Sequence, residues 1–429
     1  MHDIQQTLAV ATEHHRAGRT AEAERLYREV LAAAPGQADA LHLLGVLALQ
    51  SGRPADAADL IGQAVAADGG SAMFNANLGH ALHAVGRQRE AAVSFARALT
   101  LLCNAGEGWG NIGALANLIR RYDPDSRRAA AAEVDRDYAL GDVMRRRSLL
   151  FHLDGDLRHY RDLVAAVLAE PEGFTVPSLH YAYWGMQFQL YRGEAVDGDT
   201  GAFTRNELHG MHRLLVEQTA LRYGVTMRLR PVAPRDPVRR IALITNQVLG
   251  ADHAPSVTVL ELSRQLQDEH GCEVLVVNAN AMAVAPENGF VPEFAYNMAD
   301  GFEGVQSVAV GDGRVRMVSA TDRHFDAGKV GALVDQVAAF DPDTVVAFGA
   351  SNIVADLFAA TRPVVCLPTT AGYSPSLARI VLGHGEGDSP DDWPVADRGR
   401  FRPYTYPAGE AGADAAGRLL AYCREAQTA

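Results

Sequence analysis

The side chain best suited to proton transfer in this sequence is His253. It follows an apolar, β-branched run at 239–246 and precedes a stretch with helical spacing, so it is expected in the first strand–loop–helix turn. An imidazole at such a turn could act as a general base on the hydroxyl group of an acceptor. A loop histidine that hydrogen-bonds the backbone is the alternative, and the sequence leaves both open.

Short polar side chains follow three of the expected strands, 239–246, 344–349 and 363–368. The carboxyl ends of parallel strands meet at one edge of a sheet, where ligands bind. Capping of a helix or formation of a turn would explain the same residue types equally well. The residues expected to line a substrate cleft are Asn246, Ser351, Asn352, Thr369 and Thr370.

Strands that alternate with helices are expected to position this cleft. Besides the three strands above, 272–278 and 305–318 are apolar and β-branched, while Ser256 is expected to cap a helix and 327–340 to form another. Alternation of this kind indicates a Rossmann-like, doubly wound parallel sheet. The sequence contains neither GxGxxG after the first strand nor GxxxxGK[ST], which argues against a dinucleotide or P-loop site.

The N-terminal part repeats with a fixed period. Gly45, Gly79 and Gly113 recur every 34 residues, each after Leu or Ile, and this is the period of the helix–turn–helix tetratricopeptide repeat. A glycine there lets the second helix of the same repeat approach closely, and Tyr27, Ile61 and Phe95 are expected to fill the space between neighbouring repeats. The sequence therefore predicts an α-solenoid.

Two asparagines, Asn77 and Asn111, occupy the same position of successive repeats. Side-chain amides donate and accept hydrogen bonds, so along a groove they could hold the backbone of an extended peptide. The alternative is that each asparagine caps or bridges within its own repeat. We expect the repeats to bind a partner protein.

Four segments are expected from these patterns. They are the repeats (1–125), a helical cap and connecting module (126–230) beginning with one long helix from Ser126 to about Leu153, a Rossmann-like lobe (231–410) and a C-terminal helix (411–429). The fold class is therefore an α-solenoid joined to an α/β lobe.

Composition excludes several functions. The formal charge of −13 argues against nucleic-acid binding, and no apolar run is long enough for a membrane span. Four dispersed cysteines and the N-terminal sequence suggest reduced thiols in a cytoplasmic protein. His180, His209 and His212 lack metal-ligand spacing and are expected to be core or surface side chains rather than metal ligands. No metal site or resident cofactor is indicated.

The repeats, with Asn-Leu-Gly at Asn77 and Asn-Ile-Gly at Asn111, and the segments 345–349 and 363–383 resemble the O-GlcNAc transferase-like glycosyltransferases of the GT-B class, which include bacterial enzymes. The resemblance implies a protein acceptor on the repeats and a nucleotide-sugar donor. GT-B enzymes have two Rossmann-like lobes, and the nucleotide-sugar donor is bound mostly by the second lobe. The residues after Val238 suffice for about one lobe, so we expect the donor lobe to be missing. A noncatalytic tetratricopeptide scaffold is the alternative.

Overall fold

The computed structural model describes residues 4–107, 109–139, 141–192, 203–250, 253–281, 304–320, 324–349, 351–369, 374–383, 388–404 and 414–429. Its contacts divide the chain into two compact units, of which the first runs to Leu163 and the second begins at Val164. The boundary falls inside one helix, α10 (Leu157–Ala169). Each unit is described by itself.

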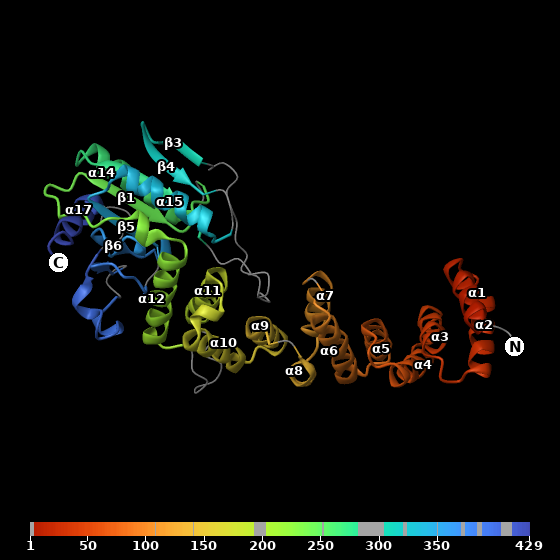
Figure 1. Ribbon diagram of the computed structural model, residues 1–429. Coiled ribbons are helices and arrows are strands. Elements are labelled where there is room, and N and C mark those ends of the chain that lie inside the picture. Colours follow the sequence, from red (N-terminus) through yellow and green to blue (C-terminus); the bar gives the residue numbers. More distant parts are fainter. Residues whose placement is uncertain are drawn as a thin grey trace. The chain divides into compact units, whose positions relative to one another are not determined.

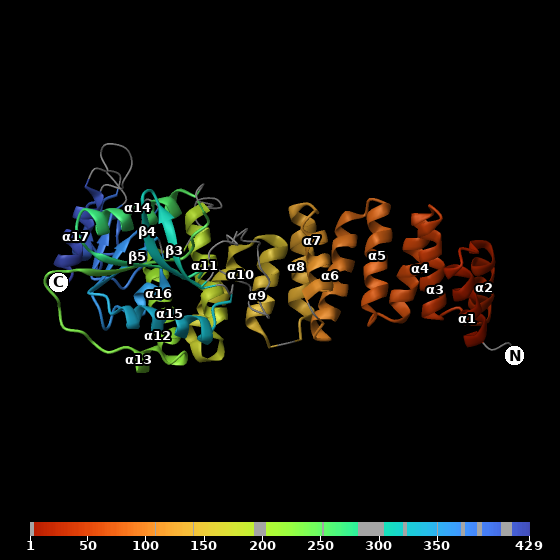
Figure 2. The same cartoon turned by 90° about the horizontal axis from the view of Figure 1, so that it is seen from above.

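The first unit begins with three antiparallel helix pairs, stacked in sequence order (Figure 2). They are α1 (Ile4–Arg16) with α2 (Thr20–Ala33), α3 (Ala38–Gln50) with α4 (Pro54–Ala67), and α5 (Ala72–Ala84) with α6 (Gln88–Asn104). A Cβ on Gly45 would lie 2.5 Å from Cγ1 of Ile61, and one on Gly79 would lie 2.6 Å from the ring of Phe95. The close helix contact predicted from the glycines is confirmed.

The repeat pattern changes after α7 (Trp109–Ile119). The next helix, α8 (Pro124–Asp137), packs chiefly against α6, and it ends before α9 (Val143–Asp154) begins. The prediction of one long helix from Ser126 to Leu153 is therefore wrong. Asp142 begins the second helix by accepting a hydrogen bond from the backbone N–H of Arg145 (3.0 Å), because an aspartate favours the N-cap position.

Helices also lead into the second unit, where α11 (Val176–Arg192) packs against α12 (Arg205–Arg222). A capping box at Thr204 and Glu207 begins α12. The short helix α13 (Val225–Arg228) contacts α15 (Ala327–Phe340), and α12 contacts α16 (Ile353–Asp356). The connecting helices thus pack directly on the α/β lobe.

The lobe is built on one sheet with the order β3-β4-β2-β1-β5-β6-β7-β8. Parallel pairing joins all strands except β3, which forms an antiparallel hairpin with β4 at one edge. The strands are β1 (Arg240–Thr245), β2 (Glu273–Asn278), β3 (Gly304–Val310), β4 (Gly313–Ser319), β5 (Thr344–Phe348), β6 (Val364–Leu367), β7 (Ile380–Leu382) and β8 (Phe401–Arg402).

Helices cover both faces of this sheet (Figures 1 and 2). On one face, α14 (Ala254–Asp268) and α17 (Ala415–Glu425) bury their apolar residues against β1, β2, β4 and β5. On the other face lie α12, α15 and α16. The fold class predicted from the sequence, an α-solenoid followed by a Rossmann-like doubly wound sheet, is confirmed, with β3 as the antiparallel addition.

All four cysteines are buried and unpaired, as the sequence predicted. Among the residues that the structure describes, no helix is both long and apolar enough to cross a membrane. The division at 125, 230 and 410 stays a prediction, as does the cytoplasmic location.

Candidate functional site

The strand order reverses between β1 and β5, and this point is where open α/β sheets bind ligands. Asn352 stands at the N-cap of α16, and its amide is shared between two elements. Its Oδ1 accepts from the backbone N–H of Ala355 (3.0 Å), and its Nδ2 donates to the carbonyl of Ile244 in β1 (2.6 Å). Asn352 therefore fixes the geometry of the crevice, while its predicted contact with a substrate stays a prediction.

Ser351 is strained as well as buried. Its φ is +59°, in the left-handed region that a serine rarely adopts, and 1% of the residue is exposed. Within the described part of the chain, its hydroxyl oxygen has no hydrogen-bond partner. Strain and an unsatisfied polar atom are both costly, and they tend to persist at binding sites.

His253 is the N-cap residue of α14, so the sequence placed the helix start three residues too late at Ser256. Nδ1 of His253 lies 2.6 Å from the hydroxyl of Ser256, which also accepts the backbone N–H of Leu249 (2.9 Å). Partial burial lowers the pKa of His253, which favours the neutral imidazole that a general base requires. These contacts support its predicted role without testing it.

The remaining cleft candidates follow β1 and β6. Asn246 is buried, and its backbone carbonyl accepts a hydrogen bond from the backbone N–H of Ala281 (3.0 Å). A Cβ added to Gly349 would lie 3.8 Å from Oγ1 of Thr369, so the loops after β5 and β6 are close together. Thr370 lies outside the described residues.

Sequence reasoning missed a second polar group, at the ends of β2 and β4. Asn278 and Ser319 are each 5% exposed and pair in register. Nearby, Nζ of Lys329 donates to the carbonyl of Asn280 (2.8 Å), and Asn280 has a φ of +50°. The sequence offered one signal for this group, which is that Lys329 is the only lysine in the chain.

His180 on α11 is fully packed beside this group. Its ring stacks on Phe325 with centroids 4.3 Å apart, and its Nε2 accepts from Nε1 of Trp184 (2.8 Å). Burial, with a smaller contribution from the charge of Lys329, lowers the pKa of His180 to about 3. Of the two positions expected for this histidine, core or surface, the structure shows the core.

The low pKa of His180 predicts acid sensitivity. In the unfolded chain His180 takes up a proton near pH 6.5, whereas in the folded chain it stays neutral down to about pH 3. The stability that the neutral, buried ring contributes is therefore complete above pH 6.5 and falls as the pH is lowered. At pH 4.5 the loss is about 3 kcal/mol. Urea unfolding of the wild type and of His180→Asn should show a stability difference that shrinks between pH 6.5 and 4.5; a difference that does not vary with pH would contradict the assignment.

A different histidine, His212, belongs to a buried network that joins three helices. Its Nε2 lies 2.6 Å from Oδ2 of Asp356 on α16, and its Nδ1 lies 3.0 Å from the hydroxyl of Tyr183 on α11. Asp356 also accepts from Ser376 Oγ (2.9 Å) and from the N–H of Leu377 (3.0 Å). This network holds α12 against the lobe on the side of β5 and is structural.

The two asparagines of the repeats have different surroundings. Nδ2 of Asn77 donates to Nε2 of His42 in the preceding repeat (2.8 Å), and His42 stacks on Phe74. Asn111 is exposed. A bridge between repeats therefore engages the Nδ2 group of Asn77. Peptide binding by either asparagine stays a prediction.

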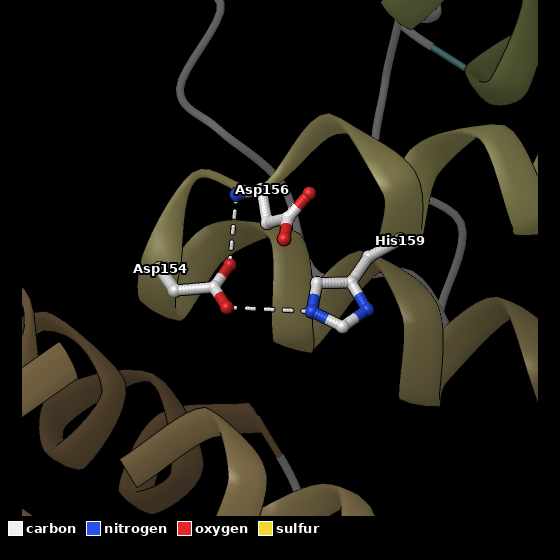
Figure 3. A group of neighbouring side chains, drawn as sticks. All are labelled: Asp154, Asp156 and His159. Carbon is white, nitrogen blue, oxygen red and sulfur yellow. Dashed lines mark hydrogen bonds and ion pairs between the residues drawn. The ribbon is translucent and has the colours of Figure 1, made fainter. Parts of the chain in front are cut away.

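Asp154, Asp156 and His159 form a group of the kind that can hold a metal ion, with one ligand atom from each within 4.8 Å of the others (Figure 3). A cavity of about 620 Å³ borders it. The groups already have partners, however, because Asp154 accepts from the N–H of Asp156 (2.8 Å) and lies 3.3 Å from Nε2 of His159. Asp156 accepts from the N–H and Nε of Arg158. The group caps α10, and its contacts alone assign no metal.

Comparison with known protein families supports the assignment of the N-terminal helices as tetratricopeptide repeats. A family model described as tetratricopeptide repeat matches residues 14–78. No curated protein matches the chain.

Three solved structures show weak overall likeness. A mutant O-GlcNAc transferase of Thermobaculum terrenum is 19% identical with a TM-score of 0.28, over 95% of this chain and 59% of its own, so the chain spans less than two thirds of that protein. The Sgt2 tetratricopeptide domain of Aspergillus fumigatus is 16% identical with a TM-score of 0.25, over 28% and 80%. A MamA protein is 21% identical with a TM-score of 0.24, over 37% and 70%. At these TM-scores none of them bears on activity.

Proposed function

We propose that this chain is a glycosyltransferase-like protein that binds a protein acceptor on its repeats and takes part in sugar transfer from a nucleotide-sugar at the carboxyl edge of its sheet. The observation that carries the proposal is the switch point between β1 and β5, where the strained Ser351 keeps a buried hydroxyl without a described partner. The tetratricopeptide match supports the protein-binding half.

In the proposed reaction, the acceptor hydroxyl oxygen attacks the anomeric carbon of the donor sugar. The bond from that carbon to the phosphate oxygen of the nucleotide breaks, and the nucleoside diphosphate (the monophosphate for a CMP-sugar) leaves with the bonding electron pair. His253 takes the proton of the acceptor hydroxyl. In the tautomer that this reaction requires, Nδ1 carries its proton and donates to Oγ of Ser256, which leaves Nε2 as the nitrogen that accepts the proton.

The proposal is tested with His253→Ala. Loss of a general base should lower the rate of sugar transfer about 100-fold or more, while binding of nucleotide-sugars in calorimetric titration changes little. UDP-, GDP- and CMP-sugars are the probes, and hydrolysis or transfer is followed by release of the nucleoside diphosphate or monophosphate. Thr258→Ala, a change at a half-buried position on the same helix, is the matched control. A folded wild-type sample that binds none of these donors rejects the catalytic proposal.

A noncatalytic scaffold is the second candidate. The family match favours it, because the sequence signal covers the repeats alone. A scaffold predicts that Asn77→Ala combined with Asn111→Ala abolishes capture of the partner protein, while His253→Ala leaves the cellular phenotype unchanged. The reverse pattern rejects the scaffold.

A further inference from the structure

We infer that β3, the outer strand of the hairpin at one edge of the sheet, binds an extended acidic segment of a partner protein as an added strand. The segment would carry carboxylates at alternate positions, facing Arg314 and Arg316 of β4. This surface belongs to the α/β lobe and not to the repeats, so the inference goes beyond the proposed function and does not depend on sugar transfer.

The two edges of the sheet differ in how they are protected. At one edge, β8 has only two residues, and the guanidinium of Arg402 pairs with Glu425 (2.6 Å). At the other edge, β3 extends over seven residues without a charge or a proline, and it pairs with β4 without a bulge (Figure 1). Natural sheets use short strands, charges, proline or bulges to keep their edges from pairing with other chains. The sequence of β3 has none of these devices and therefore favours an added strand.

The geometry of the hairpin determines which backbone groups of β3 point away from β4. Two residues separate the strands, so Val310 and Gly313 flank the turn and form a hydrogen-bonded pair. Every second residue before Val310 then directs its N–H and C=O groups outward. These residues, all exposed, are Val305, Ser307 and Ala309. Within the described part of the chain, a partner occupies one of these outward groups, since the guanidinium of Arg314 donates to the carbonyl of Ser307.

Two cations lie beside this edge on one face of the hairpin. Opposite residues of an antiparallel pair share a face, so Arg314 lies on the face of Ala309 and Arg316 on the face of Ser307. Both arginines are exposed, and neither forms an ion pair among the residues that the structure describes. Nε of Arg314 donates to Oγ of Ser307 (2.8 Å), so this side chain already extends to the outer strand.

An added strand would bring its side chains within reach of both arginines. It would lie two strand spacings from β4, about 10 Å, and the residues between, Ser307 and Ala309, have short side chains. A carboxylate accepts from a guanidinium more strongly than the neutral carbonyl of Ser307 does. Because Arg314 and Arg316 are two positions apart, the matching carboxylates are also two positions apart. Salt screens the net charge of −13 beyond the Debye length of about 8 Å, so contacts at the edge outweigh it.

The opposite face of the hairpin selects the residues between the carboxylates. Val308 and Val310 lie on that face, where they are partly buried against the core that contains α14. An added strand would continue this row, and β-branched side chains fit such a half-buried pleated surface. The surface therefore selects a segment in which Glu or Asp alternates with Val, Ile or Thr.

A second copy of this chain fits the same edge less well. Antiparallel pairing of two β3 strands that used all the outward groups would place Ser307 opposite Ser307 of the other copy. Arg314 of each copy extends to Ser307, so two guanidinium groups would meet on the same face. Like charges at such a position destabilise the pairing, whereas a carboxylate there stabilises it.

Binding is measured with the full chain by fluorescence anisotropy of labelled peptides. The acidic probe is Thr-Glu-Val-Glu-Val-Glu-Thr. The controls are the same peptide with lysine at each glutamate, and an isomer of equal composition, Glu-Glu-Glu-Thr-Thr-Val-Val. The acidic probe should bind and should slow amide hydrogen exchange at 304–310, while both controls should bind at least about tenfold more weakly.

Variants separate strand addition from simple charge attraction. Ser307→Pro removes an outward N–H and leaves the ladder to β4 intact, because an edge strand tolerates proline on its open side. It should weaken binding of the acidic probe about tenfold or more while the chain stays folded. Arg314→Glu combined with Arg316→Glu should reverse the preference in favour of the lysine peptide. Arg424→Glu, which removes an exposed cation on α17, is the matched control and should leave binding unchanged.

The inference is overturned if the acidic probe does not bind, or if it binds folded Ser307→Pro as tightly as the wild type. Equal binding of the isomer would also overturn it, since that result means charge attraction without strand addition. Self-association of the wild type that Ser307→Pro abolishes, measured by sedimentation equilibrium, would assign the edge to a second copy instead. These measurements involve no nucleotide-sugar, so their failure is distinct from failure of the proposed function.

Discussion

Replacing His212 by alanine should destabilise the second unit by about 3–5 kcal/mol. The ring is fully buried between Asp356 and Tyr183, and its removal leaves the carboxylate without its closest partner, 2.6 Å away. A buried charge that loses its partner keeps the full desolvation penalty. Urea unfolding should report the loss, and amide hydrogen exchange should rise in α12 and α16.

His209→Ala is the matched control for this result. His209 lies one helical turn earlier on α12, its side chain is 22% exposed, and its Nδ1 is 3.5 Å from Asp397. Its replacement should cost about 1 kcal/mol. In a double-mutant cycle, His212→Ala and Asp356→Ala should show strong coupling. Additive effects of the two changes would mean that the contact between them is not what stabilises the packing of α12.

In the first unit, Gly45→Ala should destabilise the solenoid by about 2–3 kcal/mol, although alanine favours helix more than glycine does. The new methyl group would lie 2.5 Å from Cγ1 of Ile61, 3.2 Å from the backbone N of that residue and 3.3 Å from the carbonyl of Ala57. Two of these neighbours are backbone atoms, so α4 itself must move away from α3. Thermal unfolding by circular dichroism measures the change.

Gly62→Ala provides the comparison within the same helix pair. Gly62 lies on α4, and a Cβ there meets nothing within 4 Å in the described structure. This change should therefore stabilise the solenoid by up to about 1 kcal/mol through helix propensity alone. If both glycine variants changed stability in the same direction, close packing at Gly45 would not be the reason for the repeat glycines.

The solenoid could be predicted because its signal is local and repeated. Gly45 and Gly79 each mark a close contact within one helix pair, and the chain restates that contact at a fixed period. Strand types in the lobe were equally readable, since buried parallel strands are continuous apolar runs. The break between α8 and α9 was missed, because a charged helical pattern on both sides of Gly141 hides the change of direction.

Sequence by itself determined which segments become helices and strands, and that polar residues follow β1, β5 and β6. Only the tertiary structure decided which of their polar atoms form hydrogen bonds within the protein. The side-chain amide of Asn352 donates a hydrogen bond to the carbonyl of Ile244, 108 positions earlier in the chain. The hydroxyl of the adjacent Ser351 has no hydrogen-bond partner among the described residues. The pairing of Asn278 with Ser319 likewise depends on strand order. Hydrogen bonds join atoms by distance in space, which the spacing of residues along a chain does not encode.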